Sequence, residues 1–295
     1  MRWQGRRGSS NIEDRRRSGA RMGGGGVRIG GLGLVALVLV GWALGVDVTP
    51  LLTGAGGGGG WSQGEAELTE AELTGAELTG ADRQIGEFVS VTLADTEEVW
   101  AGIFAEAGGS YAPATLVLFK GVTASPCGGA SGATGPFYCP SDQKVYLDTA
   151  FFDTLERQLG AGGDFAAAYV VAHEVAHHVQ DELGILREAS RARSSAGEAR
   201  SNAISVRVEL QADCLSGVFA AHAGDRFGSI EPGDIAEAMN AARRIGDDTL
   251  QRSAGRVPMP HTFTHGTSQQ REAWFRRGYE SGDIASCDTF AAQSL

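Results

Sequence analysis

Cysteine is scarce in this chain, and so are basic residues beyond its first 28 positions. Only four cysteines occur among 295 residues, and none has the C-x-x-C spacing of a cysteine-based zinc site. Residues 1–28 contain eight Arg and two acidic residues, so the remainder carries about −17 although the whole chain carries −11. Because an acidic surface repels a phosphate backbone, we expect no nucleic-acid partner.

One uncharged apolar stretch is long enough to cross a membrane, at 29–46. The Arg-rich flank before it and Asp47 after it place the amino terminus in the cytoplasm and the bulk of the protein outside. The alternative is a cleaved signal peptide, for which 43–45 would be an imperfect cleavage site. We therefore expect a disordered basic cytoplasmic tail at 1–28, a single-pass anchor in the cell membrane, and an extracytoplasmic catalytic domain.

Residues 47–82 have the composition of a linker. A glycine run at 56–60 predicts a flexible tether, and a five-residue A-E-L-T-G-like repeat follows at 66–82. The repeat resembles pentapeptide β-helix repeats, but about three copies are too few to stack stably. We expect an expanded acidic linker here, followed by one folded domain at 83–295.

Hydrophobic periodicity in 83–295 predicts a small sheet followed by helices, an α+β fold. A Gly/Ser/Ala-rich loop is expected at 121–135. The sheet should pack on the helix at 164–183 in a zincin-like arrangement. The expected strands are 115–119, 137–139 and 145–148, and the expected helices are 84–107, 150–159, 164–183, 188–222, 234–253 and 267–281.

The helix at 164–183 contains the motif H-E-x-x-H, formed by His173, Glu174 and His177. Residues four apart lie on one face of a helix, so the two imidazoles can hold one metal ion. A carboxylate beside them that is not itself a ligand suits a general base. The motif predicts a catalytic Zn²⁺ site, with Glu174 as the base.

A catalytic zinc needs a third protein ligand, and Glu209 is the best candidate. Asp213 lies four residues later on the same helical face and can accept the free N–H of a ligand imidazole, that of His173 in our interpretation. The alternative is that these two acids form an ordinary solvated helix face.

The four cysteines are expected to form two disulfides, because an even number in an exported domain favours pairing. We predict Cys127–Cys139, which closes a Gly-rich loop, and Cys214–Cys287, which ties the C-terminus to the helices. The sequence alone allows three pairings, and free buried thiols are the alternative.

Several segments together resemble the neutral zinc metallopeptidase family of bacterial membrane-anchored proteins. They are 170–180, with the H-E-x-x-H motif, 209–214, 135–140, 145–148, 263–267 and the N-terminal 11–16. The resemblance covers most of the chain, while the tether and the repeats look like insertions. It implies a zinc-dependent peptidase of the gluzincin type, with Glu as the third ligand.

Hydrolysis also requires a donor for the oxyanion that forms on the substrate carbonyl. His265 is our candidate, with His261 second, because both lie in a loop that can fold over the site. A peptide or protein substrate is expected to align with an edge strand, for which we propose 145–148. Two other readings are a catalytically silent envelope scaffold with a structural zinc and an interaction module that binds a partner through the repeats.

Overall fold

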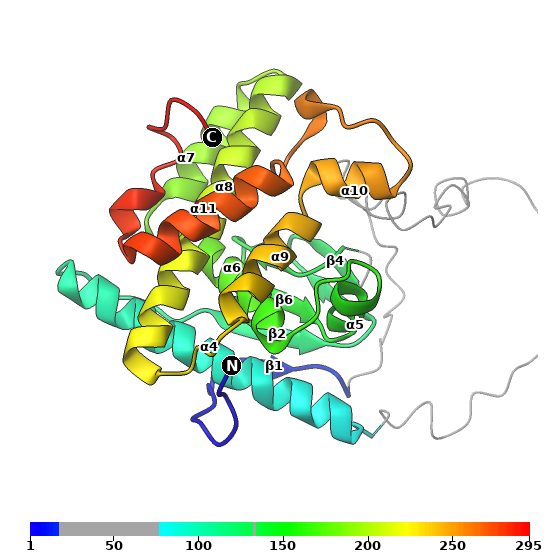
Figure 1. Cartoon of the computed structure of the whole chain (residues 1–295), viewed down its shortest axis with the longest axis vertical. Coiled ribbons are helices and arrows are strands. Elements are labelled where there is room, and N and C mark those ends of the chain that lie inside the picture. Colours follow the sequence, from blue (N-terminus) through cyan, green and yellow to red (C-terminus); the bar gives the residue numbers. More distant parts are fainter. Residues whose placement is uncertain (18–76, 132–133) are drawn as a thin grey trace, which may run out of the picture.

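The computed structural model describes residues 1–17, 77–131 and 134–295 (Figure 1). These residues form a small sheet, a hairpin and a mainly helical second half, which confirms the α+β class. In chain order the elements are β1 (Ile12–Asp14), α4 (Gly80–Glu106), β2 (Thr115–Phe119), β3 (Val122–Ser125), β4 (Gly128–Ser131), β5 (Phe137–Cys139), β6 (Lys144–Asp148), α5 (Ala150–Arg157), α6 (Asp164–Glu182), α7 (Ile185–Ser194), α8 (Glu198–Phe227), α9 (Asp234–Arg244), α10 (Asp247–Ser253), η1 (Pro260–Thr262), α11 (Ser268–Ser281) and η2 (Ile284–Cys287).

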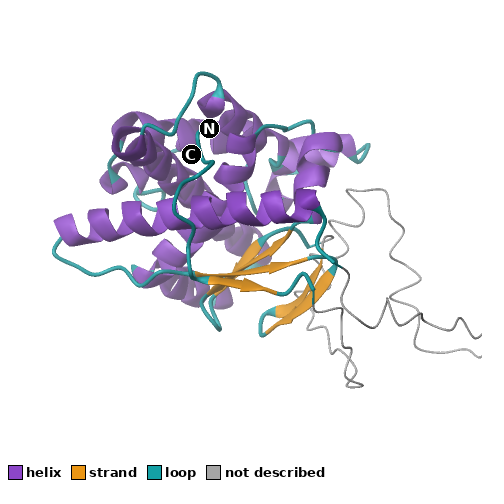
Figure 2. Cartoon of the chain, turned by 90° about the horizontal axis from the view of Figure 1, so that it is seen from below, coloured by secondary structure: helices purple, strands orange, loops and turns teal. Residues whose placement is uncertain are grey.

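The four-stranded sheet has the order β1-β2-β6-β5, with β1, β2 and β6 parallel and β5 antiparallel to β6. Side chains alternate across it, so Leu116 and Leu118 join the main core with the helices while Val117 and Phe119 face the other way. Ala130 of the β3–β4 hairpin packs on that second face. Figure 2 shows the strands along one side of the molecule, with a long helix, α4, next to them.

Helices α8 and α11 touch backbone to backbone, because glycines face each other at their contact. A Cβ atom on Gly278 would lie 1.8 Å from the carbonyl oxygen of Cys214, and one on Gly217 would lie 2.1 Å from that of Phe275. The close approach brings the side chains of α11 within reach of the carboxylates on α8. The helix pair therefore depends on residues that have no side chain.

Two regions differ from the sequence prediction. The stretch 121–135 is not wholly a loop, because β3 and β4 form an antiparallel hairpin within it. The helical regions expected at 188–222 and 234–253 are each two helices, α7 and α8, then α9 and α10. The predicted strand at 115–119 and the helix at 164–183 are confirmed, the helix to within one residue.

The expected disorder of the tail at 1–28 is wrong for residues 1–17, which fold onto the domain. Strand β1 pairs with β2, and the side chains of Met1 and Trp3 are buried in the main core. The amino group of Met1 lies 2.6 Å from Oδ1 of Asp164, the first residue of α6. The prediction failed because few apolar residues occur in this segment and their partners lie far along the chain.

The membrane prediction for 29–46 lies outside the described residues, as do most of the repeats. Within the described ranges, none of the helices is both long enough and apolar enough to cross a bilayer. The last repeat ends inside the folded domain, because Thr79 caps α4 in a reciprocal pair of hydrogen bonds with Asp82. The continuous folded region after the linker therefore begins a few residues before the expected boundary at 83.

Candidate metal site

Helices α6 and α8 bring the predicted ligands together. His173 and His177 are adjacent on α6, and Glu209 reaches them from α8. The carboxylate oxygens of Glu209 lie 3.1 Å from Nε2 of His173 and 3.6 Å from Nε2 of His177. Small buried residues occur on both helices, among them Ala172, Ala176 and Ala212, which is compatible with the contact between α6 and α8.

This donor set fits a zinc ion. One ligand atom from each of the three residues lies within 4.8 Å of the others. Tetrahedral zinc with ligands at about 2.0–2.1 Å requires donor atoms about 3.4 Å apart, close to the two separations observed. Two imidazoles and one carboxylate leave a coordination position for water, as in catalytic rather than structural sites. The side chain of Glu209 is 19% exposed, so the site is reached from solvent.

Asp213 lies behind His173, as expected. Its Oδ1 atom is 3.0 Å from Nδ1 of His173, although the N–H direction is poorly aligned with the oxygen. The carboxylate has no solvent exposure and is held by Arg271, which donates to Oδ2 at 2.8 Å and to Oδ1 at 2.9 Å. Tyr169 donates to Oδ1 at 2.5 Å. Burial alone would raise the pKa of Asp213, but the larger combined effect of Arg271 and His173 lowers it below its ordinary value. The carboxylate therefore stays ionised.

Gln180 performs the corresponding role for His177, and sequence reasoning missed it. Its Oε1 atom lies 2.8 Å from Nδ1 of His177 and accepts that N–H when Nε2 faces the metal position. Its amide nitrogen donates to the carbonyl of Val208 and to Oε1 of Gln211. Gln211 in turn donates to the carbonyl of Cys287. The available signal was spacing, because Gln180 follows His177 by three residues on the same helix face.

Glu174 lies beside the ligands on α6 and is largely buried. Burial raises the pKa of its carboxyl, and the neighbouring His173 and His177 counteract part of that rise. A carboxylate whose pKa is raised above its ordinary value accepts a proton more readily near neutral pH. The position and the pKa of Glu174 therefore suit a general base.

The ligand side chains share a proton network in the metal-free protein. Burial lowers the pKa of His173, but the adjacent carboxylates of Asp213 and Glu209 raise it to about 10. Burial raises the pKa of Glu209, while the charges of His177 and His265 and the hydrogen bond with His173 hold it well below its ordinary value.

His265 lies close enough to Glu209 for their charges to influence each other. Asp247, at the start of α10, holds it there. Its Oδ1 atom is 3.2 Å from Nδ1 of His265, and its Oδ2 atom accepts backbone N–H bonds from Thr264, His265 and Gly266. Sequence reasoning missed Asp247. His261 lies in the exposed η1 segment, and its carbonyl accepts a bond from Asn202.

The edge of the sheet beside α6 is β5, so the expectation that 145–148 forms the edge is wrong. β6 is paired on both sides, with β2 and with β5. Tyr138 of β5 donates to Asp181 of α6 at 2.9 Å and lies 3.1 Å from Nδ1 of the buried His178. These contacts fix the edge strand to the helix that holds the two histidines.

Both predicted disulfides are confirmed. Cys127–Cys139 joins the β3–β4 hairpin to the end of β5, and Cys214–Cys287 joins α8 to η2. The first therefore holds the hairpin against the edge strand. The second fixes the carbonyl that anchors Gln211.

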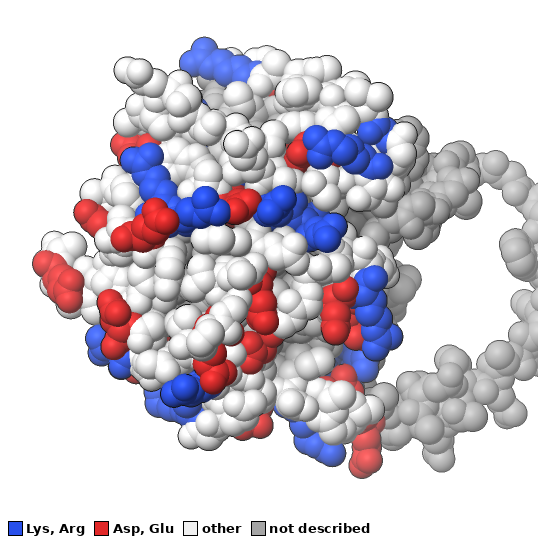
Figure 3. Space-filling model, in the orientation of Figure 1, with Lys and Arg blue, Asp and Glu red and all other residues white. Residues whose placement is uncertain are grey.

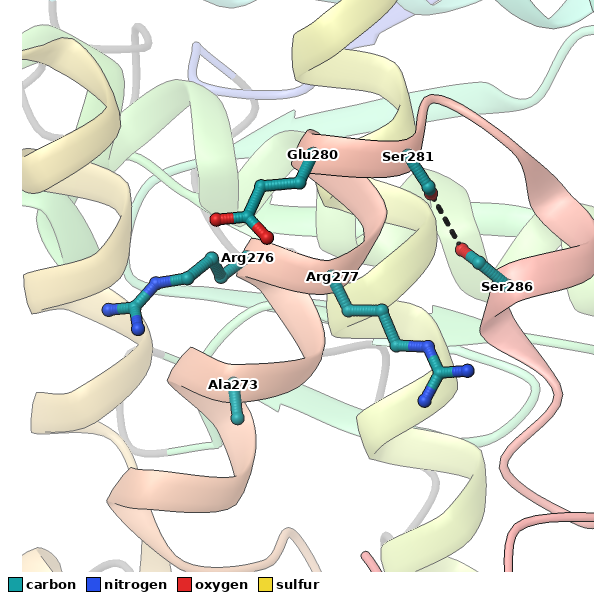
Figure 4. A pocket seen from close by; sticks show the side chains of 6 residues that line it. All are labelled: Ala273, Arg276, Arg277, Glu280, Ser281 and Ser286. Carbon is teal, nitrogen blue, oxygen red and sulfur yellow. Dashed lines mark hydrogen bonds between the residues drawn. The ribbon is translucent and has the colours of Figure 1, made fainter.

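The other polar clusters in the described residues are weaker candidates for a metal or substrate site. A second acidic group is formed by Asp164, Asp234 and Glu237, and the amino group of Met1 already pairs with the two aspartates. A surface hollow on α11 and η2, shown in Figure 4, is lined by Arg276, Arg277 and Glu280 and contains none of the candidate ligands. Basic and acidic side chains are interspersed on the face shown in Figure 3.

The chain belongs to a family of proteins described as "Putative neutral zinc metallopeptidase", whose model matches residues 1–290. The uncharacterized protein YpfJ of Escherichia coli strain K12 is 46% identical over 297 residues, which cover 98% of this chain and 99% of that protein. The uncharacterized protein Rv2575 of Mycobacterium tuberculosis strain H37Rv is 46% identical over 189 residues, which cover 60% of this chain and 62% of that protein. No solved structure matches the chain.

Proposed function

We propose that the protein is a zinc-dependent endopeptidase in which His173, His177 and Glu209 hold the metal. The observation that carries the proposal is the convergence of these three donors from two helices, with Glu174 beside them. A site with three protein ligands and an adjacent base is the arrangement of a hydrolase rather than of a structural zinc, which has four ligands. The family membership supports the same conclusion.

When bound, zinc activates a water molecule and polarises the substrate carbonyl. Glu174 takes a proton from the attacking water and passes it to the leaving amine. His265, oriented by Asp247, donates a hydrogen bond to the oxyanion. Gln180 and Asp213 keep the ligand imidazoles in the required tautomer and orientation.

The substrate is a peptide or protein in extended conformation, which pairs with the free edge of β5. Among the residues that the structure describes, β5 is paired only with β6. Its attachment to α6 through Tyr138 and His178 places that edge beside the helix that carries the motif. Backbone pairing of this kind gives affinity without strong dependence on side-chain identity.

We also propose that the protein is held at the cell membrane through 29–46 and that the catalytic domain is extracytoplasmic. The uncharged sequence of 29–46 and the two disulfides support this location, because disulfides persist in oxidising compartments. Residues 1–17 pack on the catalytic domain, so a cytoplasmic amino terminus does not fit this location.

The test compares the full chain with Glu174→Gln, measuring bound zinc by elemental mass spectrometry and internal cleavage of unfolded casein by peptide mass spectrometry. Glu182→Gln is the matched control, since it makes the same change at an exposed position of the same helix. We expect zinc in all three proteins and cleavage by the wild type and the control only.

Loss of cleavage by at least about 100-fold in Glu174→Gln, with zinc retained, would support both the activity and the base. Zinc in all three proteins without cleavage by any would favour the silent scaffold instead. Cleavage by Glu174→Gln at the wild-type rate would remove the general base from the mechanism.

A further inference from the structure

The first 17 residues, which we call the N-terminal arm, are built into the catalytic domain. Strand β1 pairs in parallel with β2, with Ile12 opposite Leu116. The backbone N–H of Leu116 donates to the carbonyl of Asn11 at 2.9 Å, and that of Arg15 donates to the carbonyl of Leu118 at 2.7 Å. The arm thus supplies one outer strand of the sheet, and β5, which contacts helix α6, is the other.

The arm also fills the core. The side chain of Trp3 is 6% exposed and packs edge-to-face on Phe88 of α4, with ring centroids 5.5 Å apart. Without the arm, Phe88 and its buried neighbours on α4 would lose their cover. A bulky aromatic residue inserted in this way is a structural part of a core rather than a passing surface contact.

Charge pairing holds the arm to α4 as well. Arg6 donates two parallel hydrogen bonds to Asp95, at 2.6 and 2.7 Å, and Asp95 is 4% exposed. Glu97 accepts from the amide of Asn11 at 2.8 Å. While the arm is docked, the guanidinium of Arg6 neutralises the buried carboxylate of Asp95, and a buried charge that lacked such a partner would be strongly unfavourable.

We propose that the arm and the catalytic domain form one folding unit and therefore lie on the same side of the membrane. A single crossing at 29–46 would place the arm and the domain on opposite sides of a hydrocarbon layer about 30 Å thick. In that arrangement none of the contacts of Trp3, Arg6 and β1 could form.

The arrangement of Gly8 and Ser90 provides a direct test. A Cβ atom on Gly8 would lie 3.5 Å from Cβ of Ser90 on α4, within the range that disulfides require. The full chain carrying Gly8→Cys and Ser90→Cys is expressed, and isolated membranes are oxidised mildly. Trypsin without reduction should then yield the peptides 8–15 and 84–120 joined by a disulfide, detected by mass spectrometry.

The matched control joins Gly8→Cys to Gly102→Cys, which lies on the same helix about 18 Å from Ser90. We expect the Gly8/Ser90 pair to crosslink in most of the membrane-bound chain and the Gly8/Gly102 pair at least about tenfold less. Absence of the Gly8/Ser90 crosslink in membranes, with both native disulfides mapped, would overturn the proposal. So would a crosslink that appears only after detergent extraction, because the arm would then dock only once released from the bilayer.

Hydrogen exchange of the wild-type protein in its membrane gives a second measurement, which requires no substitution. The arm should be as protected as β2, since their backbones bond to each other. An arm that exchanges completely within seconds while β2 remains protected would contradict the proposal.

Discussion

Replacement of Gln180 by Met should weaken zinc binding without unfolding the protein. Met has a similar volume but cannot accept the N–H of His177, which Gln180 meets at 2.8 Å. Loss of such an orienting partner reduces metal affinity about 10–100-fold, or about 1.4–2.7 kcal/mol. The assay is competition for zinc against a chelating dye, with the thermal transition of the metal-free protein recorded beside it.

Two further variants separate orientation from packing. Gln180→Glu keeps an acceptor for His177 but loses the bonds to Val208 and Gln211, so its zinc affinity should fall less than that of Gln180→Met. Glu182→Gln lies on the exposed end of the same helix and should bind zinc like the wild type. If Gln180→Met bound zinc as tightly as the wild type, the orienting role would be refuted.

Three other outcomes are expected. Gly278→Ala should destabilise the protein by at least about 3 kcal/mol in urea unfolding, because its Cβ would collide with the Cys214 carbonyl. The control Gly102→Ala should not destabilise it. Equal urea midpoints for the two variants would contradict the packing argument. Asp247→Asn should lower kcat about tenfold at unchanged zinc content by misorienting His265, and an unchanged kcat would withdraw that role. The His173 imidazolium stabilises the metal-free fold fully below pH 6.5, and this contribution is lost as pH rises through about 10. Apparent zinc affinity, measured by titration, should therefore increase with pH over that range. A pH-independent affinity would contradict this prediction.

The sequence predicted the parts of the site that depend on local spacing. His173 and His177 are four apart on a helix, and Glu209 and Asp213 repeat that spacing, so the periodicity alone placed each pair on one face. The predicted cysteine pairing is confirmed, although the sequence alone left three pairings open. These inferences needed no knowledge of tertiary packing beyond the approach of two helices.

Partners distant in the sequence could not be predicted. Arg271 reaches Asp213 only because Gly217 and Gly278 let α8 and α11 touch. The N-terminal arm was read as a disordered tail because its composition is basic and poor in apolar residues, whereas Trp3 finds its cover on a helix far along the chain. The edge strand was misassigned for a related reason, since strand order depends on how β5 turns back against β6.

The most direct test of the account is the zinc stoichiometry and coordination of the full chain, measured by elemental analysis and X-ray absorption. We predict one zinc per chain, with two imidazole ligands and oxygen ligands, and loss of that zinc in His177→Ala and Glu209→Ala. A zinc content that is unchanged in both variants, or sulfur in the coordination sphere, would contradict the assignment of the metal site.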